Sequence, residues 1–385
     1  MLSQRTAWSL AGSAWARRLE ALRAGGRPLL DLTEANPTRC GLAWDPAELH
    51  AALRHPEVAR WIPEPRGLPE ARAAVAGWLA GRGVPAGPEQ VLLTSSTSEA
   101  YGLLWKLLCD PGDEVLVPAP GYPLLDLLCE LESVRPVRYP LRYDGEWHLD
   151  RAALRAAATD RTRAVVAVSP GNPGGALLSA EERGFLEQEC AGRGWALVGD
   201  EVFADAALGP AASVAGAREC LAFHLGGLSK TCGLPQLKVA WIAAAGPRPL
   251  VQQALARLEV VADTLLSVPG PSQLALPALL ARRERFLGPL RERLAANRAL
   301  LAAAAEGAPF SLLRSGGGWS AVLRLPQTAD EERTALELLD DGVAVHPGFL
   351  YDFERPGHLV LSLLPEPATF AEGASRLRRR LAAAG

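Results

Sequence analysis

Apolar runs of strand length recur along the chain. Residues 163–168 form a nearly continuous run of alanine and valine, which is typical of a strand buried on both faces of a parallel sheet. Comparable apolar runs predict further strands at 90–94, 114–117, 195–199, 220–225 and 239–245. These runs predict a sheet with a large apolar core.

Helical segments flank these strands. Residues 7–24 are expected to be helical, and residues 247–305 are expected to be largely helical, with a break at the Pro-Gly-Pro stretch 269–271. A new group of strands is predicted from residue 316 onward. The pattern therefore predicts an α/β protein in which a second, smaller group of strands follows the main one.

Composition narrows the class of protein. The chain has 385 residues, of which 49% are hydrophobic and 22% charged, and its net charge is -3. It has no basic tract, no basic signal-like start and no apolar run of membrane-spanning length, so we expect neither nucleic acid nor a membrane as a partner. Its six cysteines lack metal-ligand spacing, so we expect no metal site, buried free thiols and a cytoplasmic location.

Lysine is scarce in this chain, which makes its positions informative. Of the 40 basic residues only Lys106, Lys230 and Lys238 are lysines, and two of them lie eight positions apart between apolar runs. A lysine amine can lose its proton in a shielded site and attack a carbonyl group, whereas a guanidinium stays protonated. A surface lysine is the simpler alternative, but the apolar flanks favour a buried nucleophile at Lys230.

The lysine segment also resembles that of a known family. Ser229-Lys230 is followed by Gly233-Leu234-Pro235 and by Lys238 ahead of a Val-Ala-Trp-Ile strand. This segment resembles the class I and II aminotransferases, which are fold type I pyridoxal 5′-phosphate (PLP) enzymes similar to aspartate aminotransferase. The resemblance extends from about residue 28 to 385. It implies that Lys230 forms a Schiff base with PLP and acts as the catalytic base.

Small hydroxyl residues precede a predicted helix after the strand 90–94. Exposed N–H groups and the positive dipole end at a helix N-terminus favour a phosphate. A plain N-cap is the alternative, but the resemblance assigns Ser96, Thr97 and Ser98 to the cofactor phosphate. It also places Lys238 at this phosphate, where relatives have arginine.

The resemblance assigns further residues to the cofactor ring. Tyr122 would stack on the ring, Asn172 in Asn-Pro-Gly-Gly would bind the ring hydroxyl, and the catalytic Asp200 would pair with the pyridinium nitrogen. Phe203 occupies a position where relatives have a tyrosine that donates to the ring hydroxyl. Its missing hydroxyl predicts an altered pKa of the Schiff base. Ile62 similarly replaces a tyrosine that in relatives reaches the neighbouring subunit's cofactor.

The substrate side departs from the family pattern. Val360 occupies the position at which relatives carry the arginine that binds the substrate carboxylate. Either another arginine, such as Arg39 or Arg355, takes over, or the substrate lacks a conventional α-carboxylate at that place. The candidates for substrate contact are Asn36, Arg39, Trp319 and Arg355.

These features together predict a PLP-dependent aminotransferase that moves an amino group between an amino acid and a 2-keto acid. Another PLP reaction, such as β-elimination or decarboxylation, and a non-catalytic PLP-binding protein are the alternatives. The resemblance implies a three-layer α/β/α large domain with a mainly parallel sheet at 46–259, a small α/β domain made of 1–45 and 260–385, and a homodimer.

Overall fold

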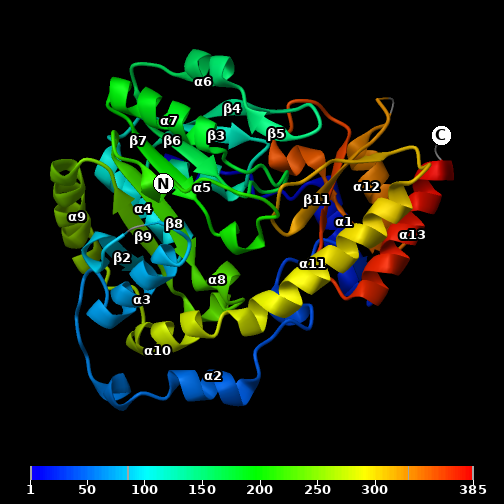
Figure 1. The fold of residues 1–385 in the computed structure, drawn as a ribbon. Helices are drawn as coiled ribbons and strands as arrows, with labels where there is room; N and C mark the ends of the chain where they lie inside the picture. The colour runs from blue at the N-terminus through cyan, green and yellow to red at the C-terminus, as the bar shows by residue number, and fades with distance from the viewer. Residues whose placement is uncertain (1, 85, 328, 384–385) are drawn as a thin grey trace.

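A computed structural model describes residues 2–84, 86–327 and 329–383. Its main feature is an eight-stranded sheet (Figure 1). In spatial order the strands are β2 (Val91–Thr94), β9 (Ala240–Ala245), β8 (Ala222–Gly227), β7 (Ala196–Asp200), β6 (Thr162–Val168), β3 (Glu114–Ala119), β4 (Arg135–Tyr143) and β5 (Trp147–Leu149).

The sheet is mainly parallel. Strands β8, β7, β6, β3 and β4 pair in parallel, whereas β9 is antiparallel to both of its neighbours and β5 is antiparallel to β4. Because β2 pairs antiparallel to the reversed β9, it points in the same direction as the parallel strands. The carboxyl ends of β2, β3, β6, β7 and β8 therefore lie on the same side of the sheet.

Helices cover both faces of this sheet. One face packs against α4 (Thr97–Leu108), α5 (Leu124–Leu131) and α9 (Arg248–Asp263). The other face is covered by α3 (Pro69–Ala80), α10 (Gly270–Ala281), α6 (Arg151–Ala157) and α7 (Ala180–Arg193). The predicted three-layer α/β/α arrangement is therefore confirmed.

A second group of elements lies beside the large sheet, on the right of Figure 1. An antiparallel sheet has the strand order β10 (Ser311–Leu312), β11 (Ser320–Arg324), β14 (His358–Ser362) and β13 (His346–Pro347), and β1 (Leu30–Asp31) pairs in parallel with β12 (Val343–Ala344). The helices that share its core are α1 (Ala14–Ala24), α11 (Glu284–Ala305), α12 (Glu331–Asp340) and α13 (Pro367–Ala383).

Shorter elements connect these parts. The remaining α-helices are α2 (Pro46–Leu53) and α8 (Leu228–Thr231). The 3₁₀ turns are η1 (Gln4–Thr6), η2 (Pro37–Arg39), η3 (Pro56–Ala59), η4 (Pro88–Gln90), η5 (Ala204–Ala206), η6 (Val214–Gly216), η7 (Pro235–Leu237) and η8 (Gly348–Tyr351).

The predicted strands all form, but the first helix is shorter than predicted. Instead of starting near residue 7, α1 begins at Ala14, because the Ser13 hydroxyl accepts a hydrogen bond from the Ala16 backbone N–H at 3.1 Å and caps the helix there. The long helical region 247–305 is divided into α9, α10 and α11, and α10 starts at Gly270, within the predicted break.

The described part of the chain contains no helix that is both long and apolar enough to cross a membrane. Within the same residues, no cluster of histidine, cysteine and carboxylate side chains could hold a metal ion. All six cysteines are free thiols, and all except Cys109 are buried.

Candidate active site

The ends of five strands bring the predicted cofactor residues together. Ser96 follows β2, Tyr122 follows β3, Asn172 follows β6, Asp200 ends β7, and Lys230 lies in α8 directly after β8. These strands all point the same way, so their carboxyl ends meet at one edge of the sheet. Each of the five residues lines one cavity.

That cavity lies between the large sheet and the smaller group of strands, and its volume is about 720 Å³. This volume is sufficient for a cofactor and a small substrate together. The described residues that line it are Thr33, Ala35, Ser96, Thr97, Ser98, Tyr101, Tyr122, Pro123, Leu124, Leu125, Leu127, Val168, Asn172, Asp200, Val202, Phe203, Gly227, Ser229, Lys230, Pro235, Ala240, Trp319, Ser320, His346, Leu350, Tyr351, Val360, Leu361 and Ser362.

Asp200 supplies the carboxylate of the cavity. The buried hydroxyl of Tyr101 donates a hydrogen bond to its Oδ2 at 3.0 Å, and the Val202 backbone N–H donates to its Oδ1 at 3.3 Å. The surrounding protein excludes bulk water and raises the pKa of Asp200, while these two hydrogen bonds lower it. The site therefore holds an enclosed carboxylate that a cationic ligand group would stabilise.

Lys230 supplies the amine. Its Nζ lies 4.7 Å from the centre of the Trp319 ring and 5.3 Å from the centre of the Phe203 ring. Burial lowers the pKa of Lys230 from 10.5 to about 8, although the negative charge of Asp200 opposes this shift. About one tenth of the amine is therefore neutral and nucleophilic at pH 7, far more than for a lysine with an ordinary pKa.

The N-terminus of α4 forms one end of the cavity. Ser96 is the N-cap residue, and its hydroxyl accepts a hydrogen bond from the Glu99 backbone N–H at 3.1 Å. Thr97 and Ser98 occupy the first turn of this helix, and both line the cavity with Ser96. Backbone N–H groups and the positive end of the helix dipole therefore meet the cavity, which suits a phosphate group.

These features fit PLP. The helix N-terminus suits a phosphate, the enclosed Asp200 suits a protonated pyridine nitrogen, and the lowered pKa of the Lys230 amine suits attack on an aldehyde. The aromatic ring of Tyr122 also lines the cavity, and 44% of its surface is exposed.

The described residues of the opposite cavity wall carry no charged side chain at neutral pH. Val360 is only 1% exposed, and it pairs across the small sheet with Val322 on β11 and His346 on β13. His346 Nδ1 lies 2.9 Å from the Tyr351 hydroxyl, and burial lowers the pKa of His346 to about 4. This histidine is consequently uncharged at neutral pH.

The predicted site residues divide into two groups. Phe203 and Trp319 line the cavity together with Ser96, Thr97, Ser98, Tyr122, Asn172, Asp200 and Lys230. Four other candidates lie outside its described lining. Lys238 and Arg355 are exposed, the Asn36 side chain accepts a hydrogen bond from the Thr38 N–H at 3.1 Å, and Arg39 pairs with Glu34 at 3.3 Å.

Sequence reasoning did not identify Tyr101 or Tyr351 as site residues. Tyr101 lies four residues after Thr97 on α4, so the two residues share one helix face, and this spacing could have signalled its position. No comparable local signal exists for Tyr351, because it reaches the cavity through the packing of η8 against distant strands.

Comparison with known proteins agrees with this arrangement. The family described as aminotransferase class I and II matches residues 39–377. Alanine aminotransferase of Mycobacterium tuberculosis is 27% identical over 373 residues, which cover 92% of this chain and 86% of that protein. A single mutant of Thermus thermophilus aspartate aminotransferase superimposes with a TM-score of 0.86 at 26% identity, and the match covers 99% of this chain and 100% of that one.

The fold also superimposes on that of alanine aminotransferase from Pyrococcus furiosus, with a TM-score of 0.90 at 22% identity and 99% of each chain covered. The family match spans most of the chain, including the lysine segment and every strand end that lines the cavity. The chain therefore belongs to the class I and II aminotransferases of fold type I, and it is a transaminase that uses pyridoxal phosphate.

Proposed function

We propose that the residues gathered at this cavity carry out transamination between an amino acid and a 2-keto acid, with Lys230 as the residue that forms a Schiff base with the cofactor. The observation that carries this proposal is the Lys230 amine, whose pKa is lowered to about 8, in one cavity with the Asp200 carboxylate and the N-terminus of α4. Relatives named alanine and aspartate aminotransferase support an amino acid and keto acid exchange.

Each polar group has a defined part in this proposal. When bound, pyridoxal phosphate supplies an electron-withdrawing ring that stabilises negative charge at the substrate carbon. Asp200 keeps the ring nitrogen protonated, and Ser96, Thr97 and Ser98 bind the phosphate. Asn172 donates to the ring hydroxyl. Tyr122 covers the ring and limits its contact with water.

Lys230 would act twice. Its Nζ would hold the cofactor and, once released by an incoming amine, would be placed to accept the proton from the substrate α-carbon. The lowered pKa suits this second task, because a group whose pKa lies near the working pH can both accept and release a proton. The rings of Phe203 and Trp319 beside Nζ keep water from competing for that proton.

Reduction and mass analysis test this assignment. The protein purified with PLP should absorb in the imine region, and borohydride should remove that band and add the cofactor mass at Lys230. Lys230→Ala should lose both the band and turnover. Lys106→Ala is the matched control, because Lys106 is exposed on α4, pairs with Glu132 and is outside the cavity lining, and it should keep the covalent attachment. Full transamination by Lys230→Ala would refute the assignment.

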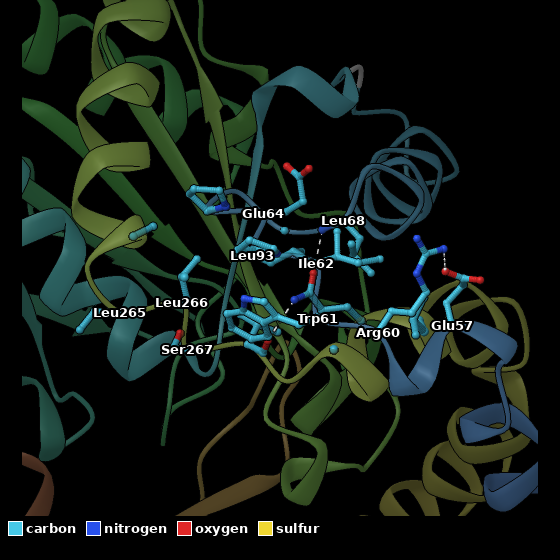
Figure 2. A pocket seen from close by; sticks show the side chains of 18 of the residues that line it. Glu57, Arg60, Trp61, Ile62, Glu64, Leu68, Leu93, Leu265, Leu266 and Ser267 are labelled. Atoms are coloured by element: carbon cyan, nitrogen blue, oxygen red, sulfur yellow. Dashed lines mark hydrogen bonds and ion pairs between the residues drawn. The ribbon is translucent and has the colours of Figure 1, made fainter.

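We also propose that the protein is a homodimer. Exposed apolar side chains gather around a small pocket, and Figure 2 shows Trp61 and Ile62 on the segment before Leu68 and Leu265 on a neighbouring segment. Trp61 is 75% exposed and Leu265 is 52% exposed, which supports a surface that a second copy covers. Sedimentation velocity should give the mass of a dimer, and Trp61→Glu should shift it toward the monomer. A wild-type monomer at micromolar concentration would contradict this.

The domain division and the compartment stay proposals. We propose a cytoplasmic enzyme, which the buried free thiols support. A division near residue 260 remains our prediction for the start of the second small-domain segment. However, Leu276, Leu279 and Leu280 of α10 pack in one cluster with Leu68 and Val75, which favours a boundary nearer to the start of α11.

A further inference from the structure

The charges inside the cavity constrain the substrate. Among the described residues that line it, the ionisable side chains other than tyrosine are Asp200, Lys230 and His346, and none is arginine. Lys230 is committed to the cofactor, and His346 is neutral because burial lowers its pKa to about 4. The bound cofactor itself adds a phosphate anion. A substrate carboxylate would therefore find no cationic partner among the described residues of this chain that line the cavity, which is unfavourable.

The arginines that the sequence suggested as substrate contacts do not supply this cationic partner. The Arg39 side chain is 73% exposed and pairs with Glu34, and Arg355 is exposed outside the cavity lining. Arg138 on β4 forms ion pairs with both Asp126 and Asp352, each at 2.6 Å. Each of these guanidinium groups would have to leave its present position to reach a ligand beside Val360.

The wall that faces the cofactor residues suits an uncharged ligand. Phe203 and Trp319 pack edge to face with ring centres 5.3 Å apart, and Val360 lines the same cavity. The polar groups on this side are neutral. They include the hydroxyls of Thr33, Ser320 and Ser362, and the hydrogen-bonded pair of Tyr351 and His346. A hydroxyl group could exchange hydrogen bonds with these partners, whereas a carboxylate would lose more hydration than they replace.

We propose that the preferred amino donor is an apolar primary amine that carries a neutral group, such as the hydroxymethyl group of an amino alcohol, where an amino acid carries its α-carboxylate. This inference rests on the transamination proposed above and replaces its amino acid donor with an amine that lacks the α-carboxylate. The apolar part of the donor would lie against Trp319 and Phe203, and its neutral group would lie beside Val360.

The reaction balances with the established chemistry. The donor loses a proton from the carbon that bears its nitrogen, its C–N bond is broken, and water supplies the oxygen of the new carbonyl group. The donor is thereby oxidised by two electrons to an aldehyde or ketone, and a 2-keto acid takes up the nitrogen and the two electrons and releases water. The described cavity lining offers no guanidinium to the keto acid either, so we expect a high KM for it.

Matched donors test the inference on the holoenzyme. L-phenylalaninol and L-phenylalanine differ only at the group in question, as do L-leucinol and L-leucine. Conversion of the bound cofactor, followed by absorbance under single-turnover conditions, should give a kcat/KM at least tenfold higher for each alcohol than for its acid. Equal or higher values for the acids would overturn the inference and leave the proposed function intact.

A binding measurement separates the two proposals. The shift in melting temperature with ligand concentration gives the affinity of unreactive analogues without any turnover. The holoenzyme should bind 3-phenylpropan-1-ol at least tenfold more tightly than 3-phenylpropionate. If no donor is converted but this preference holds, transamination as proposed fails while the neutral pocket stands. Tighter binding of the carboxylate would overturn the inference.

Substitutions at Val360 test whether the cavity wall that contains Val360 sets the preference for the alcohol over the acid. Val360→Arg should reverse the preference by at least tenfold toward phenylalanine and 3-phenylpropionate, whereas Val360→Leu should keep the preference for the alcohol. Unchanged selectivity in a folded Val360→Arg protein would contradict the placement of the neutral group. If that variant does not fold, the donor pairs on wild type and Val360→Leu decide.

Three further variants examine whether another arginine reaches the substrate. Arg39→Gln, Arg355→Gln and Arg60→Gln should each leave the ratio of alcohol to acid unchanged. Arg60 is included because it lies on the proposed dimer surface and pairs with Glu57 there (Figure 2). A selective loss of phenylalanine conversion in any of the three would identify a carboxylate-binding guanidinium and overturn the inference.

Discussion

The two walls of the active-site cavity differ in how closely they follow the family pattern. The wall formed by the ends of β2, β6, β7 and β8 carries the charged and polar groups, including Asp200 and Lys230. The wall formed by the small sheet carries Val360, Trp319 and a neutral His346. Under the proposed function, the first wall supplies the cofactor chemistry and the second wall selects the substrate.

The wall formed by the ends of β2, β6, β7 and β8 is named the cofactor wall, and the wall formed by the small sheet is named the substrate wall. Removal of a charge from the cofactor wall should have the largest effect on activity. Asp200→Asn should lower kcat by about 10³-fold for every substrate, because the ring nitrogen loses the anion that keeps it protonated. Donors with and without a carboxylate should be affected equally, since Asp200 belongs to the cofactor wall. Single-turnover kinetics with both members of a donor pair would measure this.

Asp205→Asn is the matched control for this substitution. Asp205 lies five residues away, pairs with Arg82 at 3.1 Å and is outside the cavity lining, so its loss should change kcat little. An Asp200→Asn enzyme that loses activity with only one donor class would show that the two walls do not act separately.

A smaller effect concerns the stability of the cofactor-free protein. Burial lowers the pKa of Lys230 to about 8, so between pH 8 and 10.5 the unfolded chain binds more protons than the folded one. The free energy of unfolding should therefore rise as the pH increases from 8 to 10.5. Below pH 8 the folded state carries the full cost of burying the charged amine. Lys230→Met should stabilise the cofactor-free protein at pH 7 by about 2 to 3 kcal/mol, and this gain should vanish near pH 10.5.

Urea denaturation at both pH values would measure the difference. Lys106→Met is the control, because Lys106 is an exposed lysine on α4 that pairs with Glu132, and it should change the free energy of unfolding by less than about 0.5 kcal/mol. Equal stability of Lys230→Met and wild type at pH 7 would mean that the amine is well hydrated in the folded protein.

The cofactor wall could be predicted from sequence to a greater extent than the substrate wall. Strand runs and the turns after them locate Asp200, Asn172 and Lys230, because a side chain at the end of a parallel strand reaches a shared edge regardless of the rest of the fold. The placement of Arg39 and Arg355 could not be predicted, since it depends on loop packing and on local ion pairs.

Local capping and tertiary contacts explain the remaining differences. Ser13 is a strong N-cap and starts α1 at Ala14, so the first turns of the predicted helix 7–24 do not form. The prediction from periodicity did not take this cap into account. The hydrogen bond from Tyr101 to Asp200 joins residues that are 99 positions apart, and only the fold brings them together. The roles assigned to the individual cofactor residues stay predictions.

The smallest expected effect concerns Tyr101, the residue that donates a hydrogen bond to Asp200 in the cofactor wall. Tyr101→Phe removes the hydroxyl that donates to Asp200 Oδ2 at 3.0 Å but keeps the ring, which packs against Trp105. Loss of this donor should raise the pKa of Asp200 further, because a hydrogen bond to a carboxylate favours its charged form. Cofactor affinity should fall by about tenfold, consistent with the loss of one hydrogen bond to a charged group.

The pH dependence distinguishes this role from a purely structural one. Cofactor affinity should decline as the pH falls through the pKa of Asp200, and in Tyr101→Phe the decline should begin at a higher pH than in wild type. Tyr139→Phe is the matched control, because Tyr139 is also buried but donates to the Val166 carbonyl at 2.7 Å away from the cavity. It should lose stability and keep the wild-type pH profile. The same profile in all three proteins would show that Tyr101 does not tune Asp200, and the charge of that carboxylate would then be set by burial and the Val202 N–H alone.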